Sequence, residues 1–192
     1  MAVRSGMQAL VDLVEQIVGD STNTHFNAET DVQRALDNHR TLMNGVPLRR
    51  DSTRKVFLPD STRYWQVGYF DENAVLNTSQ DQSGTLTTAN TIDYMSARFT
   101  FTAAQDNTVI LYIFGDAYNP GLAAADLLDR HPDPQDPSQL SQLRVMQWSA
   151  SFAGRNTKSK ADRLREQWQW LNRPVAGHLV ETIIDPYERR FA

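Results

Sequence analysis

The spacing of apolar residues changes twice along this chain. These two changes restrict the possible folds more than any other feature of the sequence. In the first part, apolar residues recur at helical spacing and form one stripe. Between residues 54 and 114 the pattern alternates and is rich in aromatic and β-branched residues, as is typical of strands. After residue 119 the helical spacing returns. The pattern therefore predicts an α+β protein in which antiparallel strands are inserted into a helical frame.

Two helices are predicted before the strands. The first ends at Gly19, because glycine adopts the left-handed conformation at low cost. Asn27 is a suitable N-cap for the second, which is expected to continue through His39 and Met43 and to stop at Gly45. We expect these helices to form an antiparallel pair. The apolar stripe of the first helix comprises Val3, Met7, Leu10, Val11, Val14, Ile17 and Val18.

The middle of the chain predicts a small antiparallel β-domain. Candidate strands cover residues 56–58, 63–70, 97–102 and 108–114, and the last of these is the strongest. Turn residues separate them, among them a stretch rich in Asp, Ser and Gly at residues 79–84.

Helical signals return at Asn119 and Pro120, which are a favourable cap and first helical residue. A small-residue helix follows, and a last helix is expected from Ala161 to Leu171. We therefore predict an α+β fold in which a small antiparallel helical bundle carries the β-domain and ends in an extended C-terminal tail. The expected divisions are residues 1–50 (helical pair), 51–115 (inserted β-domain), 116–173 (helices completing the bundle) and 174–192 (tail).

Composition excludes several classes of protein. The chain has 192 residues, a net charge of −4 and no cysteine. Disulfides, thiolate nucleophiles and cysteine-ligated metal sites are therefore absent. The first apolar run is interrupted by Asp12 and Glu15, so it predicts no membrane span. Because the four histidines are scattered and no catalytic or phosphate-binding motif occurs, we expect neither an enzyme, nor a metal site, nor a cofactor.

Two clusters have a functional and a structural interpretation. The aromatic residues Tyr64, Trp65, Tyr69 and Phe70 suit a sugar-binding or base-stacking platform, but their spacing favours the core of the β-domain. Residues 155–173 carry six basic side chains against two acidic ones. This excess suits phosphate, but an ordinary solvated face or a face for an acidic protein partner is the favoured interpretation.

Three segments, taken in order, resemble one family. Residues 13–40, LVEQIVGDSTNTHFNAETDVQRALDNHR, combine a helix ending in Gly-Asp, a polar loop and a helix closing on Ala-Leu-Asp-x-His-Arg. Residues 92–131 contain a Phe-Thr-Phe strand and an Ala-Ala-Ala-Asp-Leu-Leu helix. Residues 149–171, SASFAGRNTKSKADRLREQWQWL, join a small-polar stretch to a Leu/Arg-rich helix. Together they resemble the head–tail connector proteins of tailed bacteriophages, the adaptors beneath the portal, in a variant with a β-insertion.

This resemblance implies a structural virion protein rather than a catalyst. Twelve copies would form a ring beneath the portal protein, extend the DNA channel and contact a downstream neck, stopper or tail protein. Double-stranded DNA would pass without sequence-specific binding, and the protein would lie in the neck of the virion after assembly in the host cytoplasm. Subunit packing is expected at Ala123, Ala124 and Leu127. Portal docking is expected in the tail, at Leu179, Val180, Ile183, Ile184, Tyr187 and Phe191.

Two alternatives remain open. A stopper or tail-terminator protein belongs to the same assembly, but such proteins are mainly β, and the paired N-terminal helices argue against that class. A ligand- or carbohydrate-binding module that uses the aromatic β-domain is the alternative from a different class. An exposed cluster of Tyr64, Trp65 and Tyr69 would favour that module.

Overall fold

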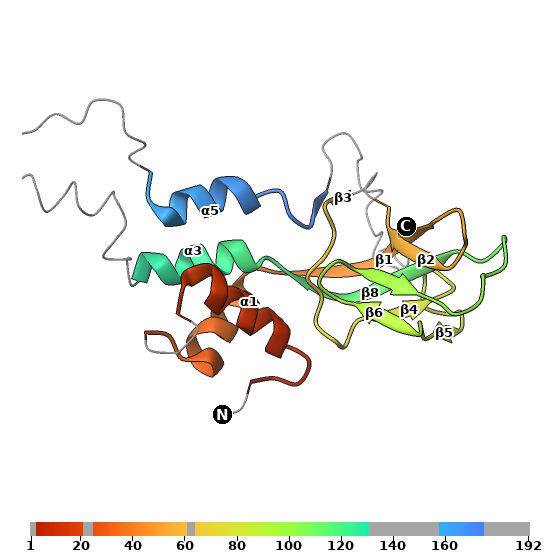
Figure 1. Cartoon of the computed structure of the whole chain (residues 1–192), viewed down its shortest axis with the longest axis horizontal. Helices are drawn as coiled ribbons and strands as arrows, with labels where there is room; N and C mark the ends of the chain where they lie inside the picture. The colour runs from red at the N-terminus through yellow and green to blue at the C-terminus, as the bar shows by residue number, and fades with distance from the viewer. Residues whose placement is uncertain (1–2, 21–24, 61–63, 131–157, 175–192) are drawn as a thin grey trace, which may run out of the picture.

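Helices and strands occupy opposite ends of the molecule in the computed structural model (Figure 1). The structure describes residues 3–20, 25–60, 64–130 and 158–174. The helical end contains α1 (Gln8–Val18), the short π-helix η1 (Ala28–Val32), α2 (Gln33–Asn38), α3 (Pro120–Arg130) and α5 (Lys160–Trp168). The fold is therefore mixed α+β, as the change of hydrophobic period predicts.

The helices share one apolar core. It contains Leu10 and Val14 of α1, Leu36 of α2 and Leu127 of α3, all almost completely buried. The predicted end of the first helix and the predicted start of the second are confirmed. Gly19 closes α1 in the left-handed conformation, with its N–H donating to the carbonyl of Glu15. The Asn27 side chain accepts a hydrogen bond from the Thr30 N–H (3.1 Å) at the start of the next helical segment.

The strands form a seven-stranded antiparallel sheet with the order β5-β4-β8-β1-β2-β7-β6. Its two edge strands, β5 and β6, are joined by residues 88–90 alone. A linker this short holds the edges near each other, so the sheet curls around its own core. The strands are β1 (Arg40–Arg50), β2 (Val56–Pro59), β4 (Val75–Asn77), β5 (Leu86–Thr87), β6 (Thr91–Asp93), β7 (Arg98–Thr100) and β8 (Leu111–Tyr118).

The long strands β1 and β8 form the centre of the sheet. They pair from Arg40↔Tyr118 to Leu48↔Leu111, with one irregularity between Asn44 and Val46. Gly45 lies at this irregularity with φ of 73°, a conformation that disfavours residues with a Cβ. The concave side of the sheet encloses a second apolar core of Met43, Val46, Leu48, Phe57, Val67, Phe70, Ala74, Leu76, Ala89, Ala97, Phe99, Phe101, Leu111, Ile113 and Ala117.

The expected continuation of the second helix to Met43 is wrong. That helix ends at Asn38, and residues 40–50 form β1, whose Met43 belongs to the sheet core. Gly45 and Pro47 disfavour helix over these residues, and eight-residue pairing with β8 stabilises the strand instead. The sheet therefore begins well before residue 51, and β8 extends three residues beyond Gly115.

Strand β8 leads directly into α3, as Asn119 and Pro120 predict. Asn119 Oδ1 accepts a hydrogen bond from the Leu122 N–H (3.1 Å) and so caps the helix. Helix α5 lies alongside α3 (Figure 1) and leads to the short strand β9 (Arg173–Pro174). Strand β9 pairs with β3 (Tyr64–Trp65), which leaves the end of the described chain beside the sheet.

Candidate functional site

Helix α5 packs against α3 with few apolar side chains. Its one buried residue is Ala161, and the Trp168 ring lies directly over Gly121 of α3. A Cβ at Gly121 would fall 2.1 Å from Cγ of Trp168, so only glycine permits this approach. The indole also lies near the Tyr69 ring, with the ring centroids 5.4 Å apart. Trp168 therefore joins α5 to α3 and to the sheet end.

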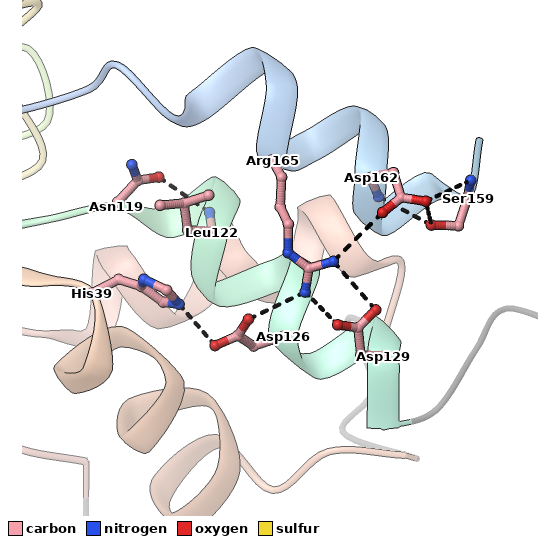
Figure 2. A network of polar contacts seen from close by, with 8 residues as sticks. All are labelled: His39, Asn119, Leu122, Asp126, Asp129, Ser159, Asp162 and Arg165. Atoms are coloured by element: carbon pink, nitrogen blue, oxygen red, sulfur yellow. Dashed lines mark hydrogen bonds and ion pairs between the residues drawn. The ribbon is translucent and has the colours of Figure 1, made fainter.

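Polar contacts supply most of the remaining attachment (Figure 2). Arg165 of α5 reaches Asp126 (3.4 Å) and Asp129 of α3, and also Asp162 of its own helix (3.7 Å). The hydrogen bond to Asp129 is the main reason that the pKa of Arg165 is raised. Ser159 and Asp162 form a reciprocal capping box that starts α5. At the same end, Lys160 Nζ donates to the carbonyl of Val18 (3.0 Å).

Asp126 connects this cluster to the junction between helices and sheet. Its second carboxylate oxygen lies 2.8 Å from Nε2 of His39, which stands between α2 and β1. His39, Asp126 and Arg165 all remain partly exposed, so their contacts are screened by solvent. The cluster links the α2–β1 junction, α3 and α5, and each of its charged groups has a partner within it (Figure 2).

A buried asparagine completes the attachment after α5. Asn172 has a φ of 58°, and only 2% of its surface is exposed. Its side chain donates to the carbonyls of Gly68 (3.2 Å) and Tyr118 (3.0 Å) and accepts from the Gly68 N–H (3.1 Å). Asn119 adds a bond from Nδ2 to the Trp168 carbonyl (2.7 Å). The segment of α5 and β9 is thus fixed to both halves of the molecule.

The sheet carries exposed apolar side chains on its convex side, which we call the outer face. Residues paired across antiparallel strands point to the same side, and neighbours along a strand alternate. Val75 pairs with Phe114, Asn77 with both Tyr112 and Leu86, and Leu42 with Asp116. These pairings place on one side the exposed residues Leu42, Val75 and Leu86, together with Leu58 through its pairing with Arg49.

The predicted subunit-packing residues face the interior of this chain. Ala123, Ala124 and Leu127 are completely buried in the helical core, so the described chain itself covers them. A contact with another subunit at these positions stays a prediction. The predicted docking residues Leu179, Val180, Ile183, Ile184, Tyr187 and Phe191 lie outside the described residues.

The aromatic residues considered as a ligand platform are separated by the fold. Phe70 belongs to the sheet core, and Tyr69 is half-buried against Trp168. Burial raises the pKa of the Tyr69 hydroxyl. Strand β3 contains Tyr64 and Trp65, whose side chains lie outside the described set. The ligand-binding alternative therefore stays a hypothesis without an assembled site in the described chain.

Sequence reasoning missed the outer face and the α5 network. Leu42 falls within the predicted second helix, so the sequence carries no signal for its position on a sheet. Leu86 stood alone among Thr and Gly residues, without the alternation that identifies a strand. The pairing of Arg165 with Asp126 depends on the packing of α3 against α5, which no local pattern specifies.

The part of the chain that the structure describes holds no candidate for two common kinds of site. Within those residues, no group of three or more His, Asp or Glu side chains is arranged to hold a metal ion. No described helix has the length and apolar character needed to cross a membrane.

Comparison with protein-family models, with curated proteins and with solved structures finds no match to this chain.

Proposed function

We propose that this protein is a structural adaptor of the kind found at the head–tail junction of tailed bacteriophages. The proposal starts from the resemblance of three ordered segments, which together span most of residues 13–171. In this proposal, the helices correspond to the small bundle of such adaptors, and residues 175–192 correspond to their extended tail. The curled sheet is the inserted domain.

The firm attachment of α5 and β9 is the observation that carries the proposal. A tail that binds the portal can hold its subunit in a defined position only if the base of the tail is fixed to the rest of the subunit. Here Trp168, Arg165 and Asn172 fix the base to α3, to the sheet end and to the loop at Gly68. Pro174 then pairs in β9, directly before the apolar residues of the C-terminal segment. This arrangement supports a tail that links subunit to portal.

The proposed assembly is a ring, twelve-fold under a twelve-fold portal, that extends the DNA channel and offers its lower surface to the next neck or tail protein. The net charge of −4 suits a wall past which DNA slides during packaging and genome ejection, because fixed cations would bind its phosphates. The protein would act in the host cytoplasm during assembly and in the virion neck afterwards.

Electron microscopy of the protein with the portal protein of the same genome tests this proposal. We expect rings on the portal that share its symmetry. Removal of residues 175–192 should leave the circular dichroism spectrum of a folded protein and abolish binding to the portal. A full-length chain with Thr182→Ala is the matched control and should bind normally. Equal binding by the truncated and full-length chains would contradict tail docking, and absence of any portal complex would contradict the adaptor function.

A further inference from the structure

Exposed apolar side chains occur on four of five adjacent strands of the outer face. Along the order β5-β4-β8-β1-β2 these residues include Leu86 (68% exposed), Val75, Leu42 (73% exposed) and Leu58. Ile110, one residue before β8, continues the same side, since its neighbours Val109 and Leu111 both contact the sheet core. The face is about 20 Å across the five strands, and between these apolar side chains it also carries the polar residues Asn44, Arg49 and Asp116. Apolar side chains that gather on one exposed face mark candidate contact sites.

The flank of this face is acidic. Among residues 64–97, which include β4, β5 and β6, the exposed charged residues are Glu72, Asp81 and Asp93, and Asp93 pairs with Arg98 of β7. Hydrogen bonds from the Ser79 and Ser83 hydroxyls lower the pKa of Asp81 to about 2, so this carboxylate stays ionised. A complementary surface should therefore present an apolar anchor surrounded by positive charge.

Helix α5 presents such a surface on the same chain. Trp170 is 55% exposed, and it is the one large exposed apolar residue of the described chain outside the outer face. Residues 158–173 contain five basic residues and two acidic ones. We define the α5 surface as the exposed residues Lys158, Arg163, Gln167, Trp170 and Arg173.

We propose that the α5 surface of one copy of this chain packs on the outer face of a second copy. Trp170 would cover apolar side chains around Leu86 and Val75, while Arg163 and Arg173 approach the acidic flank. The two surfaces differ and belong to separate elements, so the contact is head-to-tail and can repeat around a ring. Tryptophan and arginine are the residues that most often dominate such contacts. The inference deepens the proposed ring and rests on that function, but the contact can be measured without a portal.

Two variants test the contribution of each surface to self-association separately. Trp170→Ala removes the anchor from the α5 surface, and Leu86→Arg places a positive charge on the outer face opposite a basic partner. Both residues are exposed, so each variant should keep the unfolding temperature of the parent protein. We expect sedimentation velocity to show concentration-dependent self-association of the parent that each variant weakens by about 30-fold or more. Gln16→Ala on α1 and Asn38→Arg on α2, at exposed positions outside both surfaces, are the matched controls and should associate like the parent.

An equal mixture of the two variants tests the head-to-tail geometry. The Trp170→Ala chain keeps an intact outer face, and the Leu86→Arg chain keeps an intact α5 surface. The mixture should form dimers that cannot extend, whereas each variant alone stays monomeric. A mixture that remains monomeric, or a parent chain that is monomeric at every concentration, would overturn the inference.

Salt provides a further readout of the same contact. Because the contact joins opposite charges, self-association of the parent should weaken as salt rises. Portal capture reports separately on the proposed function. Capture without self-association contradicts this inference alone, and self-association without capture contradicts the adaptor function alone.

Discussion

At the scale of single residues, the buried carboxylate of Glu15 lowers the stability of the folded protein. It lies on the buried side of α1, and its Oε1 has no hydrogen-bond partner among the described residues. Burial raises the pKa of Glu15, and the nearby carboxylates of Asp12 and Asp20 raise it further. The folded state therefore holds the Glu15 proton more tightly than the unfolded chain, so stability falls as pH rises above the unfolded pKa near 4.5.

We predict that Glu15→Gln stabilises the protein at pH 7 by up to about 1 kcal/mol, because it removes a buried charge without changing shape. The advantage should vanish below pH 4.5, where the carboxyl is protonated in both folded and unfolded chains. Urea unfolding at pH 7 and pH 4 measures both values. Glu72→Gln, at an exposed position, is the control and should change little. A gain of equal size at both pH values would show that charge is not the cause.

At the scale of elements, the contact between α3 and α5 depends on the absence of one Cβ. Gly121→Ala should destabilise the protein by about 1–3 kcal/mol, because the added methyl overlaps the Trp168 ring. Alanine otherwise favours a helix over glycine by up to about 1 kcal/mol. In a Trp168→Ala background, Gly121→Ala should therefore become neutral or stabilising. Urea unfolding of the four chains in this double-mutant cycle measures the reversal, and equal destabilisation in both backgrounds would exclude the steric explanation.

Local signals predicted the ends of elements better than their identity. Gly19, Asn27 and Asn119 each act as expected because capping depends on neighbouring residues alone. His39 and Met43 continue the helical spacing of the second helix. The residues from Arg40 nevertheless form β1, because pairing with β8 outweighs the local preference. Likewise, α5 was predictable from its apolar spacing, whereas its attachment through Arg165 and Asn172 depends on partners far away in the chain.

At the scale of the whole molecule, the helical core and the sheet core are joined by two very short linkers and by side-chain packing between them. Only His39 separates α2 from β1, and only Asn119 separates β8 from α3. Tyr118, at the end of β8, is buried in the helical core, and burial raises the pKa of its hydroxyl to about 12. Its hydroxyl also accepts a hydrogen bond from Arg4 (2.7 Å). The sheet is therefore less separable than the predicted division at residues 51–115 suggests.

These connections predict a single cooperative unfolding transition. Leu10→Ala opens a cavity in the helical core, and Ile113→Ala opens one in the sheet core. Each should cost about 2–5 kcal/mol and lower the same calorimetric transition, because neither core can unfold without exposing the β1 and β8 junctions. Calorimetry of both variants, together with hydrogen exchange of the helical and sheet amides, measures whether the two cores unfold together. If Ile113→Ala instead splits the heat absorption into two peaks and leaves the helical amides protected, the sheet is an independent domain. In that case, a docked tail would position only the helices, and the sheet would need contacts of its own to be held in the ring.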